Sequence, residues 1–184
     1  MGHPASQEAV FDPGRVKDLV RDIPDFPRPG VVFKDITPLL ADAAGLASCI
    51  DALAQRFAAE GVDKVLGVEA RGFIIAAPVA YNLGAGFVPV RKKGKLPYRV
   101  HSHTYQLEYG TDTLEVHTDA LRPGERVLVI DDVLATGGTA AATCALVGSL
   151  GAEVAGFGCV IELGFLGGRD RLTGARVEAL VSYE

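Results

Sequence analysis

The chain has 184 residues, 48% of them hydrophobic and 22% charged, which is an ordinary globular composition and a length suited to one domain. Its formal net charge of −5 argues against nucleic acid as a general partner, although a local basic patch could still bind a small anion. No run of about 18 apolar residues predicts a membrane span, and Cys49, Cys144 and Cys159 lack metal-binding spacing, as expected of buried free thiols in a reducing cytosol.

The first forty residues show little regular periodicity. We expect residues 1–12 to form a loose arm and residues 15–22 to form a short helix. Three prolines interrupt residues 25–40, DFPRPGVVFKDITPLL, so we expect an ordered loop there. The run 31–33, which includes Phe33, is apolar within this loop. It could pack on the core. Alternatively, it could contact a flat ligand, with neighbouring backbone groups forming hydrogen bonds to the ligand's edge.

The next part of the chain predicts a parallel sheet. Apolar residues recur at helical spacing over 46–57. A strand, a helix and a strand are then expected over residues 64–68, 73–82 and 87–90. Such a βαβ unit places its strands in parallel, and ligands bind at the carboxyl ends of parallel strands. Arg71 and the basic cluster RKKGK at 91–95 both follow predicted strands, so we expect them to lie at one edge of the sheet.

Residues 97–110, PYRVHSHTYQLEYG, are polar and aromatic without a clear period. Residues 111–117 alternate in polarity and predict a strand. We interpret the aperiodic segment as a mobile lid over a ligand site.

The stretch 127–142, VLVIDDVLATGGTAAA, carries the strongest chemical signal. A buried strand is predicted over 127–130, followed by the adjacent carboxylates of Asp131 and Asp132. A loop rich in glycine and threonine then leads into a helix; it consists of Ala135, Thr136, Gly137, Gly138 and Thr139. Free backbone N–H groups and the helix dipole make such a loop an anion site.

The acid pair restricts which anion fits. Carboxylates beside a phosphate would repel it unless they face hydrogen-bond donors, such as a ribose diol, or a cation such as Mg²⁺. A structural turn with two solvated aspartates is the alternative. The fixed order of strand, acids, loop and helix favours a sugar-phosphate site. With further strands over 154–163 and 176–182, the chain predicts a single α/β domain over 1–184, with a mostly parallel twisted sheet flanked by helices.

The strand, acid pair and loop resemble the phosphoribosyl pyrophosphate (PRPP) motif of type I phosphoribosyltransferases. Three further motifs narrow the resemblance to the adenine phosphoribosyltransferase family over residues 25–184; they are FPRPGVVFKDITPLL, ARGF followed by RKKGKLP, and YQLEYG. The resemblance implies a type I phosphoribosyltransferase fold with a small N-terminal hood for the base within residues 1–40. It also implies a flexible lid over 97–110.

The family's reaction converts adenine and PRPP to AMP and pyrophosphate in purine salvage. The resemblance therefore implies a cytoplasmic homodimer that needs Mg²⁺ carried by PRPP, with no metal ligand from the protein itself. It implies no nucleic-acid partner and no membrane partner.

The resemblance also assigns roles to individual residues. Asp131 and Asp132 would hold the ribose hydroxyls, and Ala135 to Thr139 would hold the 5′-phosphate. Further contacts to PRPP or AMP would come from Arg71, Arg91, Lys95 and Tyr109. Adenine would be bound by Val32, Phe33, Lys34 and Leu163, with lysine at position 34 where family members often have arginine. Glu108 would be the catalytic carboxylate of the lid, because adenine loses its N9 proton as the glycosidic bond forms.

Three alternatives remain open at this point. The protein could use hypoxanthine, guanine or xanthine instead of adenine, although the loop around Phe33 argues against these bases. It could be a regulator that senses PRPP, although neither a basic helix nor spare length for a DNA-reading segment is present. It could be an interaction domain with an inactive site, but both acids and the loop are intact.

Overall fold

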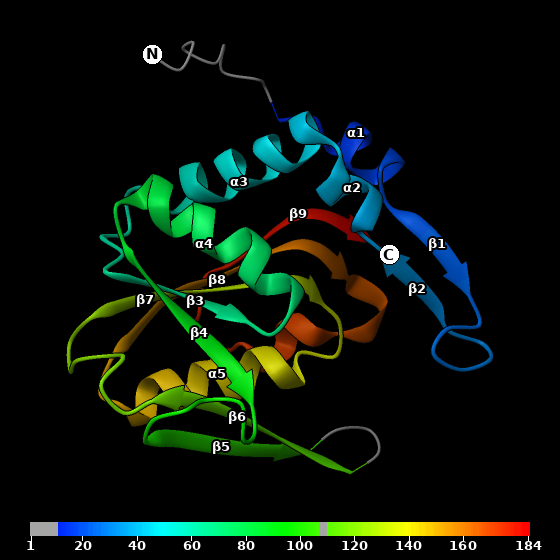
Figure 1. Ribbon diagram of the computed structural model, residues 1–184. Coiled ribbons are helices and arrows are strands. Elements are labelled where there is room, and N and C mark those ends of the chain that lie inside the picture. Colours follow the sequence, from blue (N-terminus) through cyan, green and yellow to red (C-terminus); the bar gives the residue numbers. More distant parts are fainter. Residues whose placement is uncertain (1–10, 107–109) are drawn as a thin grey trace.

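The computed structural model describes residues 11–106 and 110–184 and is built around one seven-stranded sheet (Figure 1). The strands lie in the order β5-β6-β4-β3-β7-β8-β9. Their bounds are β3 Lys64–Val68, β4 Gly86–Lys92, β5 Val100–Gln106, β6 Thr111–His117, β7 Arg126–Leu134, β8 Glu153–Leu163 and β9 Val177–Tyr183. The five strands β4, β3, β7, β8 and β9 are mutually parallel, and β6 and β5 add to the β4 edge as an antiparallel hairpin.

Helices cover both faces of the sheet. On one face lie α3 (Ala43–Phe57) and α4 (Arg71–Leu83), which share a hydrophobic cluster with the buried side of the sheet (Figure 1). On the other face lies α5 (Gly138–Ser149), within a second cluster. Burial on both faces explains why the central strands read as nearly continuous apolar runs. The predicted α/β fold with a mostly parallel sheet is confirmed.

The N-terminal segment forms a small layer beside the sheet, which we call the hood (residues 13–41). It contains α1 (Pro13–Asp18), α2 (Thr37–Ala41) and the antiparallel pair of β1 (Arg21–Pro24) and β2 (Val32–Asp35). The expectation of a loop over 25–40 was therefore wrong for β2 and α2. These elements are short, and β2 pairs only with the exposed β1, so neither produces a long apolar period.

Two further expectations need correction. Residues 100–106 of the predicted lid are not aperiodic loop but strand β5, paired along its whole length with β6. Its residues are mostly exposed edge positions, so the alternation of buried and exposed side chains is weak. In addition, Asp131 and Asp132 lie inside β7 rather than after it, because pairing with β8 continues to Leu134.

Candidate active site

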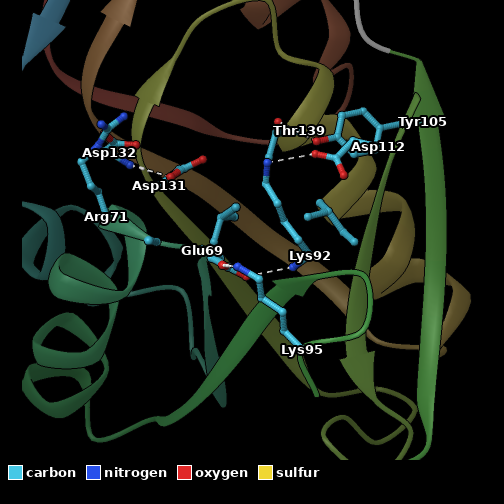
Figure 2. A pocket seen from close by; sticks show the side chains of 12 residues that line it. Glu69, Arg71, Lys92, Lys95, Tyr105, Asp112, Asp131, Asp132 and Thr139 are labelled. Atoms are coloured by element: carbon cyan, nitrogen blue, oxygen red, sulfur yellow. Dashed lines mark hydrogen bonds and ion pairs between the residues drawn. The ribbon is translucent and has the colours of Figure 1, made fainter. Parts of the chain in front are cut away.

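A cavity of about 610 Å³ opens at the carboxyl ends of the central parallel strands (Figure 2). Its lining comes from the ends of β3 and β4, the first turn of α4, the β5–β6 hairpin, β7 and the start of α5; the residues are Val68, Glu69, Ala70, Arg71, Lys92, Lys95, Tyr105, Asp112, Leu114, Asp131, Asp132 and Thr139. The sheet therefore brings together the basic, acidic and loop residues that the sequence separated by up to seventy positions.

The acid pair forms one wall of this cavity. Asp132 is largely buried. It accepts a hydrogen bond from Nε of Arg71 and forms an ion pair with it. Asp131 accepts a hydrogen bond from the Asp132 amide at 2.8 Å through Oδ1. Burial and the neighbouring Asp132 carboxylate raise the pKa of Asp131 well above its usual value. The two acids are thus unequal, since Arg71 forms a hydrogen bond and an ion pair with Asp132, whereas burial and the Asp132 charge outweigh its effect on the pKa of Asp131.

The loop from Ala135 to Thr139 lines a second, smaller cavity of about 80 Å³ at the N-terminus of α5. Gly137 precedes the helix with φ +78°, a left-handed conformation that favours glycine. The loop backbone lies against Gly168, such that a Cβ on Gly168 would stand 2.1 Å from the Ala135 carbonyl oxygen. A glycine-containing loop with free backbone amides at a helix N-terminus is a phosphate-binding arrangement.

A set of hydrogen bonds from Arg169 to Glu162 and Val177, which we call the Gly168 brace, holds Gly168 in place behind the loop. Its neighbour Arg169, in a short 3₁₀ turn (Gly168–Arg171), donates to Glu162 at 2.9 and 2.6 Å and to the Val177 carbonyl at 2.9 Å. The hydrogen bond from Arg169 lowers the pKa of Glu162. Residues 164–170, GFLGGRD, carry no pattern in the sequence that indicates this role, because it depends on contacts between distant segments.

The basic residues are held by a carboxylate that the sequence analysis did not assign. Glu69 accepts from Nε of Arg91 at 3.0 Å and is ion-paired with Lys95. It also accepts from the Lys92 amide at 3.0 Å. Burial alone would raise the pKa of Glu69, but these hydrogen bonds outweigh that effect and lower the pKa to about 2. Glu69 is therefore an internal anion that orients the cations.

The opposite wall adds two residues that sequence reasoning missed, Tyr105 and Asp112. Lys92 is ion-paired with Asp112 of β6 at 3.2 Å, and Tyr105 of β5 hydrogen-bonds Thr139 at 3.1 Å (Figure 2). A β-strand interpretation of residues 100–106 would have directed attention to Tyr105, because it would have placed the hairpin beside the sheet edge.

Three of the predicted base-binding residues, Val32, Phe33 and Lys34, lie in the hood. The half-buried ring of Phe33 packs edge-on against Phe26, with centroids 5.3 Å apart. The guanidinium carbon of Arg71 lies 5.2 Å from the Phe33 centroid, so the hood contacts the residue that pairs with Asp132. Val32 is exposed.

Lys34 turns its side chain toward the chain's own residues. Its Nζ donates to Asp22 at 2.7 Å and lies 4.1 Å from the ring centroid of Tyr183. Leu163 ends β8 and pairs in register with the same Tyr183. The ammonium group therefore stabilises the hood on the end of β9.

Two predicted site residues, Glu108 and Tyr109, lie outside the residues that the structure describes, so their assigned roles remain predictions.

Comparison with known proteins agrees with this geometry. A family model described as a phosphoribosyl transferase domain matches residues 35–174. That range contains the acid pair, the phosphate loop and the cations of the cavity, and the chain belongs to the phosphoribosyl transferase family.

Within that family the chain belongs with the adenine phosphoribosyltransferases. The enzyme of that name from Acidothermus cellulolyticus is 62% identical over 162 residues, covering 88% of this chain and 92% of the relative. The crystal structure of adenine phosphoribosyltransferase from Thermoanaerobacter pseudethanolicus is 48% identical, with a TM-score of 0.91 over 94% of this chain and 100% of that one. The Saccharomyces cerevisiae enzyme, complexed with an imino-altritol bisphosphate and adenine, is 38% identical, with a TM-score of 0.86 over 92% of this chain and 98% of that one.

Proposed function

We propose that the protein transfers the 5-phosphoribosyl group of PRPP to N9 of adenine, giving AMP and pyrophosphate. The observation that carries this proposal is that one cavity joins an acid pair and a cation cluster to Thr139, the last residue of the loop, while Arg71 connects it to the aromatic hood. Each part fits one part of PRPP or of the base.

The sugar phosphate fits between the loop and the acids. Amides of residues 135–139 would bind the 5′-phosphate, and the Asp131 and Asp132 carboxylates would accept hydrogen bonds from the ribose hydroxyls. Lys95 lines the same cavity, and both Arg91 and Lys95 pair with Glu69. Cations there stabilise the charge that builds on pyrophosphate as the bond to C1′ breaks.

Adenine fits against the hood. Its flat ring would contact Phe33, with the backbone groups of Val32 and Lys34 reading its edge and Leu163 closing the other side. The side chain of Lys34 is already engaged by Asp22 and Tyr183, which supports reading by the backbone alone. A backbone carbonyl can accept a hydrogen bond from the 6-amino group of adenine. In guanine or hypoxanthine the same carbonyl would face an oxygen, which cannot donate a hydrogen bond.

Mg²⁺ would reach the site on PRPP. This ion keeps several waters and binds through one or two carboxylates together with substrate phosphate oxygens. Asp131 and Asp132 lie at the cavity wall, where they would hold the ribose of the PRPP that carries the ion rather than bind the ion directly. When bound, the ion would neutralise charge on the departing pyrophosphate.

We further propose a cytoplasmic homodimer. Ile74, Ala77 and Tyr81 form one exposed stripe along α4. Phe87 of β4 is also exposed, and its ring packs against that of Phe73 in α4. An exposed apolar stripe of this kind fits a second copy of the chain.

Cys49, Cys144 and Cys159 are free thiols, as a reducing compartment allows. No helix in the described ranges combines the length and apolar character needed to cross a bilayer.

A radiolabelled-base assay tests the activity. Adenine, hypoxanthine, guanine and xanthine are each incubated with PRPP, with Mg²⁺ or with excess chelator. We expect nucleotide to form from adenine alone and only with Mg²⁺. Preferred use of another base, or full turnover in chelator, would refute the corresponding part of the proposal.

Sedimentation velocity tests the assembly. We expect a dimer at micromolar concentration, and Tyr81→Glu should shift it toward monomer because a charge would be buried at the contact. A monomeric and fully active wild-type protein would contradict the dimer.

A further inference from the structure

Tyr105 connects the antiparallel hairpin to the phosphate loop. Its hydroxyl lies 3.1 Å from Oγ1 of Thr139, the last residue of the loop (Figure 2). Its ring also borders the loop, since a Cβ on Gly138 would stand 3.7 Å from two of its carbon atoms. Tyr105 comes from β5 and Thr139 from the first turn of α5, two elements that pack together. The half-buried Tyr105 therefore lines the cavity beside the predicted phosphate position.

The chemistry of two hydroxyls fixes the direction of this hydrogen bond once an anion binds. A phosphate oxygen only accepts, so Thr139 must donate its single proton to it. Oγ1 of Thr139 then remains an acceptor, and the Tyr105 hydroxyl must be the donor. In this arrangement the phenol holds the Thr139 side chain in the rotamer whose proton points at the phosphate.

We propose that Tyr105 is a positioning residue that orients Thr139 for the 5′-phosphate of the sugar-phosphate substrate. The inference rests on the proposed function, because it assigns the loop to that phosphate. It adds Tyr105, a side chain outside the loop that acts on the phosphate through Thr139. It also makes the β5–β6 hairpin part of the phosphate site.

If Tyr105 served packing alone, its hydroxyl would not be needed. The ring packs within the second hydrophobic cluster and would do so without its oxygen. Tyr105→Phe keeps the ring and removes only the hydroxyl, so it separates the two roles. Tyr98→Phe is the matched control: Tyr98 is 57% exposed and its ring contacts His117 rather than the loop.

The experiment measures ribose 5-phosphate binding by isothermal titration calorimetry on the full-length wild type and both variants. This probe carries the phosphate without the pyrophosphate or the base. Loss of one neutral hydrogen bond weakens binding by about two- to tenfold. We expect that increase in Kd for Tyr105→Phe and an unchanged Kd for Tyr98→Phe. In the complete reaction, KM for PRPP should rise by a similar factor, while KM for adenine should change less than about twofold.

A double-mutant cycle with Thr139→Val tests whether Tyr105 acts through Thr139. If it does, Tyr105→Phe has no further effect on ribose 5-phosphate binding in the Thr139→Val background. Additive losses, or a Tyr105→Phe variant that binds like wild type, would overturn the inference. If the wild type made no nucleotide from adenine but the cycle showed coupling, the proposed reaction would fail while the role of Tyr105 stood.

Discussion

Arg71 donates a hydrogen bond from Nε to Oδ2 of Asp132. Because the guanidinium of Arg71 also lies over the ring of Phe33, a single side chain connects the predicted ribose site to the predicted base site. For the neighbouring Asp131, burial and the charge of Asp132 outweigh the effect of Arg71, and its pKa is raised. The two adjacent acids should therefore respond differently to the same substitution.

Asp131→Asn and Asp132→Asn should both weaken PRPP binding, by about 10- to 100-fold, the cost of losing a charged hydrogen-bond acceptor. Their effects on stability should diverge. Asp132→Asn removes the partner of the part-exposed Arg71 and should lower Tm by about 2–4 °C, for about 1 kcal/mol. Asp131→Asn removes a like-charge repulsion, so Tm at pH 7.5 should equal or exceed that of wild type.

Thermal melts and PRPP titrations on both variants check this. A large drop in Tm for Asp131→Asn would mean that this acid is needed for folding. Wild-type PRPP affinity in either variant would remove that acid from the site.

Glu69 should make stability depend on pH in the acid range. Its pKa is lowered in the folded protein to about 2, from an ordinary value of 4.5. A lowered pKa stabilises the folded state fully above pH 4.5, and that contribution is lost as the pH falls through about 2. Glu69→Gln should therefore lower Tm at pH 7 by about 2–8 °C, for a loss of about 1–2 kcal/mol.

The difference in Tm between Glu69→Gln and wild type should shrink as the pH is lowered from 4.5 toward 2. Differential scanning calorimetry across that range measures it. A difference that stayed constant with pH would show that the carboxylate charge has no part in the stabilisation.

Gly168→Ala should impair PRPP binding through the backbone of the phosphate loop. The added Cβ would lie 2.1 Å from the Ala135 carbonyl oxygen and 2.9 Å from the Gly137 nitrogen, so the loop must move. Such a displacement should raise KM for PRPP at least tenfold, and overpacking costs about 1–3 kcal/mol.

Gly148→Ala is the matched control for this substitution. Gly148 lies in α5, and its Cβ would meet nothing within 4 Å. This variant should keep the wild-type KM and should melt up to about 4 °C higher, because alanine is the better helix former. Equal KM values for the two alanine variants would contradict a steric role for Gly168.

Glu108→Gln tests the catalytic residue predicted from the YQLEYG motif. Glutamine keeps the size of the side chain but cannot accept the N9 proton of adenine. General base help of this kind is worth about 10²–10⁴-fold, so kcat should fall by that factor with little change in KM for PRPP. Steady-state kinetics measure it, and turnover within about threefold of wild type would exclude a catalytic role.

The sequence predicted the central strands and the glycine- and threonine-rich loop before α5 because their signals are local. The apolar run before Asp131 and the glycine and threonine residues after it are contiguous, and burial on both faces leaves little ambiguity. The polar β5 was missed for the opposite reason. It is a mostly exposed edge strand, and its pairing with β6 satisfies the backbone without requiring an apolar pattern.

Glu69, Tyr105 and the Gly168 brace could not be predicted because their roles depend on partners far away in the chain. Glu69 meets Lys95 and Tyr105 meets Thr139, across 26 and 34 positions respectively. Neither residue type is unusual at its position. Only the folded sheet brings a carboxylate to the cations, or a phenol to the loop.

The pairing of Glu69 with Arg91 and Lys95 has a consequence for how ionic strength affects the enzyme. An incoming pyrophosphate group would meet cations already paired with a carboxylate rather than bare positive charge. The protein's own anion would then compete with it alongside dissolved salt. Because Glu69 is tethered, its local concentration does not change when the buffer is diluted, and affinity for the polyanion should vary less with salt than an unpaired cation cluster would require.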